Sequence, residues 1–302
     1  MCMTTALDFL YNGEMNVNID KNKIYVPPLK IQGIKTKLIP VISENIELNK
    51  DTVWIEPFMG SGVVGFNIAP KKAIFCDTNP YIIQFYNDLK NEIVSSEIIR
   101  KYLEIASVKL QNGGTDYYYE VRNRFNKEHS SLDFLFLNRS CFNGLMRFNS
   151  KGDFNVPFCH KPNRFSKAYI TKIVHQVEHI EKQIKDKDWT FVCQSFEDTI
   201  SAALNIENAF IYCDPPYIGR NVDYFGGWTE EDEKRLKDVL LLSKKNFMIS
   251  TWDYNEYRKN EYISTLWKDC NKINIPHFYH VGAKEKNRVA MMEALLMNYK
   301  IC

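Results

Sequence analysis

The chain constrains its own fold most strongly at residues 209–217, which read AFIYCDPPY. The apolar run before the acid contains β-branched and aromatic residues, which favour a buried strand. Because proline cannot donate a hydrogen bond to a sheet, this strand is predicted to end at Asp214. Ligands bind at the carboxyl edge of the strands in open α/β sheets. Asp214 is therefore expected at a binding edge, on a loop that Pro215 and Pro216 make rigid.

An acid, a fixed carbonyl and an aromatic ring in this order suit a planar base that carries an exocyclic amine. The lone pair of an adenine amine is delocalised into the ring, so the nitrogen attacks only when acceptors hold its hydrogens in a pyramidal geometry. Asp214 and the carbonyl of Pro215 are the predicted acceptors, and Tyr217 is predicted to stack on the base. The alternative is an ordinary strand and Pro-Pro turn with a solvated acid.

A second strand, residues 52–56, leads into the loop PFMGSG, a helix-like run and a further strand that ends at Asp77. Gly60 and Gly62 would let the backbone turn tightly beside a ligand, and an acid that closes the next strand can accept both hydroxyls of a ribose. The run GSGVVG lacks the GxGxxG spacing of dinucleotide loops. A nucleoside with an amino-acid tail, such as S-adenosylmethionine, therefore fits better than NAD, and the alternative is a structural turn with a surface acid.

Two further segments are candidates for the same pocket. Gly33 and Lys35 precede an apolar, helix-like run, and a glycine turn at a helix start exposes backbone N–H groups. With the charge of Lys35, they are predicted to suit an anion such as a carboxylate; the alternative is a capped surface helix with solvated lysines. After the strand-like run WTFVCQ, Ser195 is expected to cap a helix and Phe196 to flank an adenine.

Basic charge is concentrated in residues 138–172, where glycines, prolines and aromatic residues are interleaved. Seven Lys and Arg stand there against one acid, Asp153. This mixture supplies phosphate contacts, wedging rings and amides that can read base edges, although a folded β-hairpin with a solvated rim has the same composition. Its place before the 209–217 strand predicts an inserted recognition domain. The basic residues are Arg139, Arg147, Lys151, Lys161, Arg164, Lys167 and Lys172.

Composition narrows the remaining possibilities. The 302 residues include 39 basic and 37 acidic side chains, a net charge of +2, so any nucleic-acid surface must come from local charge. No signal peptide or membrane span is indicated, and a cytoplasmic protein is expected. The eight cysteines are scattered without a CxxC pair, which is typical of reduced thiols. His175 and His179 lack the order of a zinc-binding motif, so no metal is expected.

After an N-terminal extension of residues 1–23, the expected domains are one that carries the two strand-end acids, residues 24–95 and 187–302, and an inserted domain, residues 96–186. Three closing strands, NFMIST, KINI and EALLMN, are predicted. The loop IGRNVDYFGGW is predicted to move over the site, and HVGAKEKNR to form a hairpin loop.

Taken together, these motifs resemble the Dam-type, alpha-group family of DNA adenine-N6 methyltransferases across nearly all of residues 25–300. The resemblance rests on the N-terminal lysine motif and on EPFMGSG, CDTNP, FLNRSCFNGLMRFNSKGDFNVPF, CQSFED, YCDPPY and EALLMN. It implies an α/β fold: a Rossmann-like, S-adenosylmethionine-dependent methyltransferase sheet, mostly parallel and ending in an antiparallel hairpin. It also implies an inserted, mainly helical DNA-recognition domain.

The resemblance assigns roles by position. Many relatives have WAGGK where this chain has IQGIK, so Ile31 and Ile34 replace an aromatic residue and a glycine. The implied cofactor-binding residues are Ile31, Lys35, Phe58, Gly60, Gly62, Asp77, Ser195, Phe196 and Asp214. The implied DNA-binding residues are Arg139, Phe142, Asn143, Leu145, Arg147, Asn149, Lys151 and Arg164. The implied catalytic residues are Asp214, Pro215, Pro216 and Tyr217.

The implied activity is methylation of a flipped adenine in double-stranded DNA. Because the likeness runs through the recognition segment, the expected site is GATATC, modified at the adenine that follows G, with another palindrome beginning GAT as the alternative. The expected setting is a restriction-modification system, whose endonuclease would act on the same site without a stable complex. An RNA adenine-N6 methyltransferase, which would prefer unpaired RNA, and a catalytically inactive DNA-binding protein are the rival functions.

Overall fold

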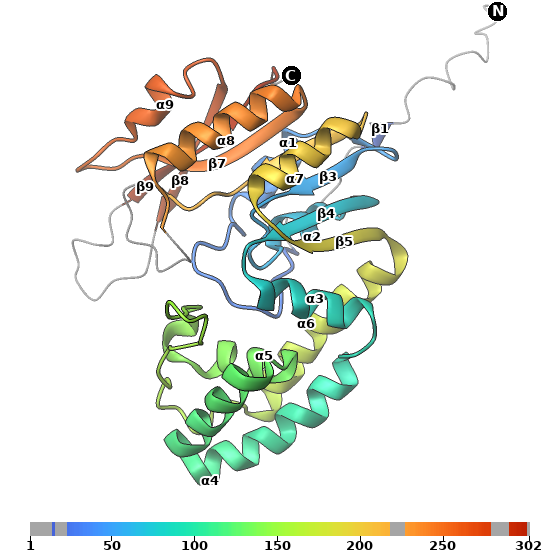
Figure 1. Ribbon diagram of the computed structural model, residues 1–302, viewed down its shortest axis with the longest axis vertical. Coiled ribbons are helices and arrows are strands. Elements are labelled where there is room, and N and C mark those ends of the chain that lie inside the picture. The colour runs from blue at the N-terminus through green and yellow to red at the C-terminus, as the bar shows by residue number, and fades with distance from the viewer. Residues whose placement is uncertain (1–13, 16–22, 218–226, 279–289, 301–302) are drawn as a thin grey trace, which may run out of the picture.

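The computed structural model describes residues 14–15, 23–217, 227–278 and 290–300. Figure 1 shows two parts, a twisted sheet covered by helices and a helical part below it. The main sheet has seven strands in the order β5-β4-β3-β6-β7-β9-β8. Its strands are β3 (Val53–Glu56), β4 (Lys72–Asp77), β5 (Asp188–Cys193), β6 (Ala209–Cys213), β7 (Asn246–Tyr254), β8 (Asn271–Phe278) and β9 (Ala290–Met297). Two short strands, β1 (Glu14–Met15) and β2 (Leu48–Asn49), pair separately.

The sheet is parallel from β5 through β7, and β9 runs antiparallel between β7 and β8. The predicted α/β class, with a mostly parallel sheet that ends in antiparallel strands, is confirmed. Alternation along β3 explains the layers, because Trp54 packs into one hydrophobic core and Ile55 into a second core on the other face. The covering helices are α1 (Ile39–Glu44), α2 (Val63–Ile68), α3 (Pro80–Lys90), α7 (Phe196–Ala202), α8 (Glu230–Ser243) and α9 (Glu261–Thr265).

The helical part is an insertion in the sheet domain. It begins after β4 and the helix that follows it, α3, and it ends before β5. Its elements are α4 (Ser96–Glu128), α5 (Ser131–Ser140), the 3-10 turn η1 (Phe142–Gly144) and α6 (Lys167–Asp186); a second 3-10 turn, η2 (Ala203–Asn205), follows α7. Helix α4 bends at Gly114, whose φ of 50° is left-handed. Arg124 joins α4 to α5 through two bonds, Nε at 2.8 Å and Nη2 at 2.7 Å, to the buried carboxylate of Asp133.

Some expectations are corrected and others lie outside the described residues. The helix expected to open at Gly33 and Lys35 begins instead at Ile39, with Pro40 in its first turn, so the glycine turn is not at a helix start. Most of residues 1–23, IGRNVDYFGGW and HVGAKEKNR lies outside the described residues. No helix within the described parts of the chain is long and apolar enough to span a membrane.

A buried acid closes β3 beneath the glycine loop. Glu56 is 1 % exposed, and Trp54 Nε1 donates to its Oε2 at 2.9 Å. Helix α2 approaches it so closely that a Cβ on Gly65 would lie 2.4 Å from the same oxygen. Burial raises the pKa of the Glu56 carboxyl from its ordinary value of 4.5 to about 8. The folded protein therefore holds this proton more tightly than the unfolded chain.

This difference predicts a pH dependence of stability. The contribution of Glu56 is complete below its ordinary pKa of 4.5 and is lost as the pH rises toward about 8. Each pH unit in that window costs at most about 1.4 kcal/mol. Glu56→Gln, which keeps an acceptor for Trp54 and cannot ionise, should flatten the decline in the free energy of unfolding between pH 5 and 8, measured by urea denaturation. Glu104→Gln, at an exposed helical position, should leave the decline unchanged; equal slopes for both variants would contradict the assignment.

Candidate active site and DNA interface

The carboxylate of Asp214 stands directly after β6, at the carboxyl edge of the sheet. Its Oδ1 lies 3.0 Å from Lys35 Nζ and accepts a 2.7 Å hydrogen bond from Ser250 Oγ on β7. The side chain of Asp214 is 22 % exposed. Burial raises the pKa of this carboxyl, while Lys35 and Ser250 act in the opposite direction. The acid is thus held in one orientation by two donors from different segments.

Lys35 and Tyr217 complete this cluster. Lys35 Nζ donates to the carbonyl of Gly33 at 2.7 Å and lies 4.9 Å from the centre of the Tyr217 ring. Tyr217 is 8 % exposed, and its hydroxyl donates to Glu293 Oε2 at 2.9 Å. The structure therefore brings three predicted residues together. The cluster also includes Ser250 and Glu293. Our sequence analysis placed them in the closing strands NFMIST and EALLMN but gave neither a role, because a single polar residue in an apolar run does not reveal its partner.

The second predicted acid, Asp77, closes β4 beside the glycine loop. Its Oδ2 accepts from the N–H of Gly60 at 2.9 Å, and its Oδ1 accepts from the N–H of Asn79 at 2.8 Å. Burial raises the pKa of Asp77, and these N–H groups oppose the shift. Gly60 and Gly62 have φ values of 49° and 77°, the left-handed region that favours glycine. A Cβ on Gly60 would lie 3.6 Å from Ile31, so Ile31 packs against the loop.

A cluster of three aromatic rings lies near the carboxyl ends of β3 and β5. Phe58, after β3, stacks on Phe196 at a centroid distance of 5.4 Å. Trp228 contacts both rings, at 5.6 Å and 5.5 Å, and its Nε1 donates to the buried Glu233 at 2.6 Å. Ser195 caps α7 as predicted, because its Oγ accepts from the N–H of Asp198 at 3.1 Å. Our sequence analysis included Trp228 as the last residue of the loop IGRNVDYFGGW but gave it no role.

The basic segment after α5 folds as a small antiparallel hairpin. Phe148 pairs with Phe154, and a turn holds Asn149, whose Nδ2 bonds Asp153 Oδ2 at 3.1 Å. Phe142 is 49 % exposed. The remaining predicted positions differ in exposure: Asn143 and Lys151 are exposed, and Leu145, Arg147 and Arg164 are partly buried. The hairpin considered as an alternative is therefore present, and the exposed Phe142 and Asn143 lie just before it in the chain.

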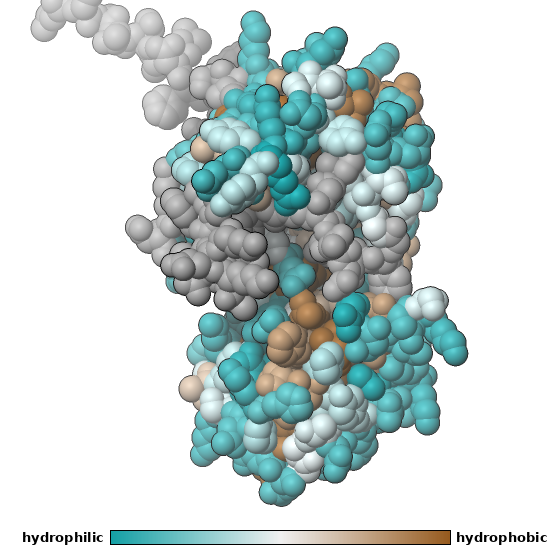
Figure 2. Space-filling model, turned by 90° about the vertical axis from the view of Figure 1, so that its left-hand side faces the viewer, coloured by the Kyte–Doolittle hydropathy of each residue, from teal (hydrophilic) through white to brown (hydrophobic). Residues whose placement is uncertain are grey.

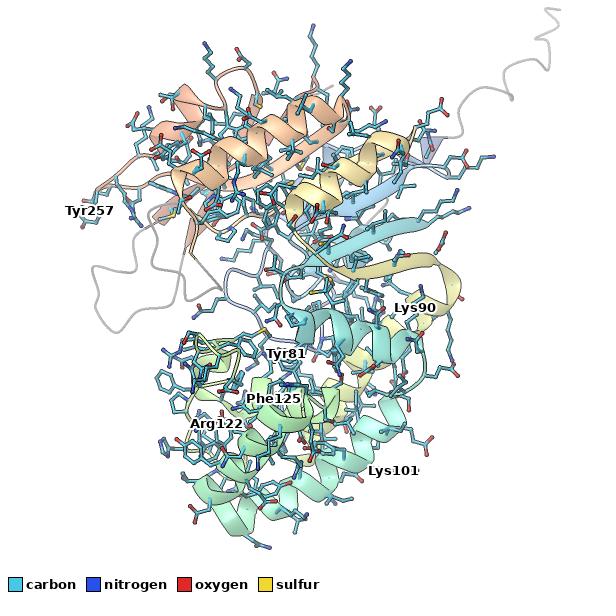
Figure 3. All side chains as sticks on the ribbon, viewed as in Figure 1. Tyr81, Lys90, Lys101, Arg122, Phe125 and Tyr257 are labelled. Atoms are coloured by element: carbon cyan, nitrogen blue, oxygen red, sulfur yellow. The ribbon has the colours of Figure 1, made fainter. Side chains whose placement is uncertain are left out.

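Two sets of contacts attach this basic segment to the sheet part: one with α3 and one with the N-terminal segment that contains Lys30. Tyr81 on α3 stacks on Phe148 at 5.1 Å, and Figure 3 shows Tyr81 where the helical part meets the sheet part. Asn138 bonds both backbone groups of Lys30, at 2.7 Å and 2.8 Å. Figure 2 shows apolar surface gathered on the helical part close to this junction. The basic segment therefore has a defined position relative to α3, which begins shortly after Asp77.

Arg139 differs from the prediction of a direct DNA contact. It is 3 % exposed, and its guanidinium donates to the side chain of Gln176 and, at 3.3 Å, to the hydroxyl of Tyr169. Arg164 Nε donates to the Arg139 carbonyl at 2.8 Å. Because α6 covers its polar group, Arg139 supports the segment from inside and does not present its charge to solvent.

The two helical histidines lie on α6. His175 is exposed, and His179 stacks on Tyr25 at a centroid distance of 3.9 Å. Across the described part of the chain, no three His, Cys, Asp or Glu side chains gather as metal ligands would.

Comparison with known proteins agrees with this geometry. The family model described as D12 class N6 adenine-specific DNA methyltransferase matches residues 32–284. The DNA adenine methylase of Vibrio cholerae is 33% identical over 234 residues, covering 74% of this chain and 78% of the relative. The Type II methyltransferase M.MjaIII of Methanocaldococcus jannaschii is 30% identical over 303 residues, covering 90% of this chain and 99% of the relative.

A longer relative is similar over almost the whole chain. The Type II methyltransferase M.FokI of Planomicrobium okeanokoites is 28% identical over 298 residues, which is 95% of this chain but 45% of that protein. The family model covers well over half of the chain, including Lys35, Asp77, the basic hairpin and Asp214. The chain therefore belongs to the D12 class of N6 adenine-specific DNA methyltransferases.

Proposed function

We propose that this DNA adenine-N6 methyltransferase transfers the methyl group of S-adenosylmethionine to the first adenine of GATATC, as the modification enzyme of a restriction-modification system. The observation that carries the chemical part is the cluster of Lys35, Asp214 and Tyr217 at the carboxyl edge of β6. In the proposal, residues 24–95 and 187–302 form the catalytic domain and residues 96–186 the recognition domain. A cognate endonuclease would share the site without a stable complex.

The residues around Asp77 fit S-adenosylmethionine. Each oxygen of Asp77 accepts one backbone N–H and keeps a lone pair that can accept a ribose hydroxyl. Phe58 is partly exposed and offers a ring face to the adenine, with Phe196 packed behind it. Lys35 would hold the carboxylate of the amino-acid tail of S-adenosylmethionine. We assign Ile31, Gly60, Gly62 and Ser195 to the walls of the same pocket. The cofactor supplies an electrophilic methyl group on a sulfonium.

The protein's own contribution is made at Asp214. Its carboxylate and the Pro215 carbonyl would hold the two hydrogens of the adenine amine, which localises the nitrogen lone pair. Ser250 and Lys35 restrain the carboxylate at 2.7 Å and 3.0 Å, so no rotation is needed when the base arrives. Direct displacement needs no covalent intermediate and no nucleophilic cysteine. Pro216 keeps the turn rigid, and Tyr217, restrained by Glu293, would stack on the base.

The recognition sequence rests on a resemblance within the family. The stretches VPPLKIQGIKTKL, EPFMGSGVVGFN, LFLNRSCFNG, DPPYIGRNVDYF and FYHVGAKEKNR resemble the EcoRV modification methyltransferase. Phe142 and Leu145 would fill the space that the flipped base leaves. Arg147 would pair with guanine N7 and O6, since its Nε bond to Asn155 at 2.9 Å orients the guanidinium. Asn143, Asn149, Lys151 and Arg164 are assigned to base edges and phosphates, with Arg139 supporting them from inside.

Chemistry at Asp214 is tested by substitution. Asp214→Ala should abolish methyl transfer and leave binding of duplex DNA largely intact, because the acceptor is lost while phosphate contacts remain. Asp214→Asn should be severely impaired as well. Tritium transfer from labelled cofactor and gel-shift titration measure the two properties. Asp238→Asn, an exposed acid on α8, is the control. Turnover near the wild-type rate in either variant would remove Asp214 from the mechanism. If the unsubstituted protein binds DNA but transfers no methyl group, the result would favour an inactive DNA-binding protein.

The cofactor assignment is tested at Asp77. Asp77→Ala should weaken S-adenosylmethionine binding by about 1–3 kcal/mol, because two hydrogen bonds to the ribose are lost. Titration calorimetry measures this change, and circular dichroism checks the fold, since Asp77 also holds the glycine loop. Asp51→Ala, at the opposite edge of the sheet, is the control. Equal calorimetric affinities for wild type and the Asp77 variant would rule the assignment out.

Specificity is tested by sequencing DNA from cells that express the protein, with detection of N6-methyladenine. Modified adenines should map to the first adenine of GATATC.

Arg147→Ala should cost about 1–3 kcal/mol of discrimination at the first guanine. Lys161→Ala, at an exposed position, should weaken binding to all sequences alike and flatten its salt dependence. Modification at sites without GAT, or an unchanged choice of guanine in the Arg147 variant, would refute the specificity while leaving the enzyme class intact.

A further inference from the structure

The turn between Tyr254 and Lys259, residues 254–259, stands on the same sheet edge as Asp214. Strand β7 runs parallel to β6, and Cys213 pairs with Ile249. Beyond that level β7 continues for five more residues to Tyr254, which at roughly 3.3 Å per residue carries the chain about 16 Å further. The 254–259 turn therefore projects well past the edge where Asp214 lies.

The sheet order places this turn on the opposite flank of Asp214 from the helical insertion. The insertion leaves the sheet after β4 and returns at β5, which are both on one side of β6. Strand β7 is the neighbour of β6 on the other side. In Figure 1 the turn, between β7 and α9, and the helical part lie at opposite ends of the molecule's left-hand side. A duplex that delivers a base to Asp214 would lie between these two projections.

The 254–259 turn is built as a rigid element. Tyr254 and Lys259 form an antiparallel bridge, and Asn255 Oδ1 accepts from the N–H groups of Tyr257 and Arg258, both at 3.0 Å. The guanidinium of Arg258 lies 5.0 Å from the centre of the Trp252 ring. After the turn, Asn260 Nδ2 donates to the Trp252 carbonyl at 2.9 Å, which fixes the base of the turn.

The turn presents aromatic and basic side chains to solvent. Tyr257 is 68 % exposed and Tyr254 44 % exposed, and Arg258 and Lys259 are exposed beside them. Figure 3 shows Tyr257 at the outer tip, directed away from the body of the protein. A tyrosine hydroxyl donates to phosphate oxygens, its ring packs on a sugar, and Arg and Lys supply the opposite charge to a phosphate. Glu256 is the one acid within the turn.

We propose that the 254–259 turn is a second DNA-contacting element, which binds the sugar-phosphate backbone on the flank of the target adenine opposite the helical part. Tyr257 and Lys259 make the contact, and Arg258 holds the turn on Trp252. The element contacts backbone and not bases, so it adds affinity without changing the sequence that is read. This inference rests on the DNA methyltransferase function and adds a surface to it.

Fluorescence anisotropy at several salt concentrations tests the proposal. It measures binding to a duplex that contains the target sequence of the enzyme. Tyr257→Ala and Lys259→Ala should each weaken binding about five- to tenfold, and Lys259→Ala should reduce the salt slope by about one. Tyr257→Phe should recover part of the loss, because the ring remains. Lys50→Ala and Lys72→Ala remove exposed cations at the opposite edge of the sheet and should bind like the wild type.

Trimmed duplexes locate the contact. Because GATATC is a palindrome that the protein can bind in either orientation, both flanks are shortened equally, and this shortening should abolish the difference between wild type and Tyr257→Ala. Single-turnover methyl transfer at saturating DNA should be unchanged in both turn variants, because the 254–259 turn does not touch the reacting base. Turn variants that bind as tightly as the Lys50 and Lys72 controls would overturn the proposal, and so would a loss that no trimming removes. A wild-type protein that methylates no DNA would instead refute the proposed function.

Discussion

The partly buried pair of Lys35 and Asp214 is the interaction on which the catalytic edge depends. Two charges taken out of water are tolerated only when they pair and their remaining bonds are satisfied. Lys35 Nζ also bonds the Gly33 carbonyl, and Asp214 also accepts from Ser250. Tyr217 extends the cluster to Glu293 on β9. The N-terminal segment and β7 therefore restrain the Asp214 carboxylate that follows β6, and β9 restrains the neighbouring Tyr217.

The proposed cofactor site and the proposed DNA-contacting hairpin are connected through the first turn of α3. Asp77 bonds the N–H of Asn79, whose Nδ2 lies 3.3 Å from Met146 Sδ, and Tyr81 stacks on Phe148 in the hairpin. These are short, direct connections between the proposed ribose ligand and the residues on either side of Arg147. The exposed 254–259 turn lies on the other flank of Asp214. The two parts that we propose to contact DNA therefore lie on opposite flanks of the strand end that carries Asp214.

Much of the fold was predictable because it depends on local chemistry. Proline ends β6, so Asp214 had to stand at a strand end, and the left-handed glycines of the loop after β3 mark a turn that other residues rarely adopt. Apolar runs rich in β-branched and aromatic residues predicted the strands, and Ser195 capped its helix as expected. Local signals failed where a neighbour decided the outcome. The covering helix α6 buried Arg139 in this way, whereas the start of α1 after Lys35 follows from a local signal, Pro40, that our sequence analysis did not use.

By itself, the sequence determined the class of the sheet, the order of its motifs and the identity of the acids at its edge, because strand endings and turns are set by neighbouring residues. Only the tertiary structure decided what each acid meets. Ser250 and Glu293 reach Asp214 and Tyr217 from strands that are paired through long-range contacts. The exposure of Tyr257 likewise depends on how far β7 extends beyond β6. Such contacts join residues far apart in the chain, and no local pattern of residues specifies them.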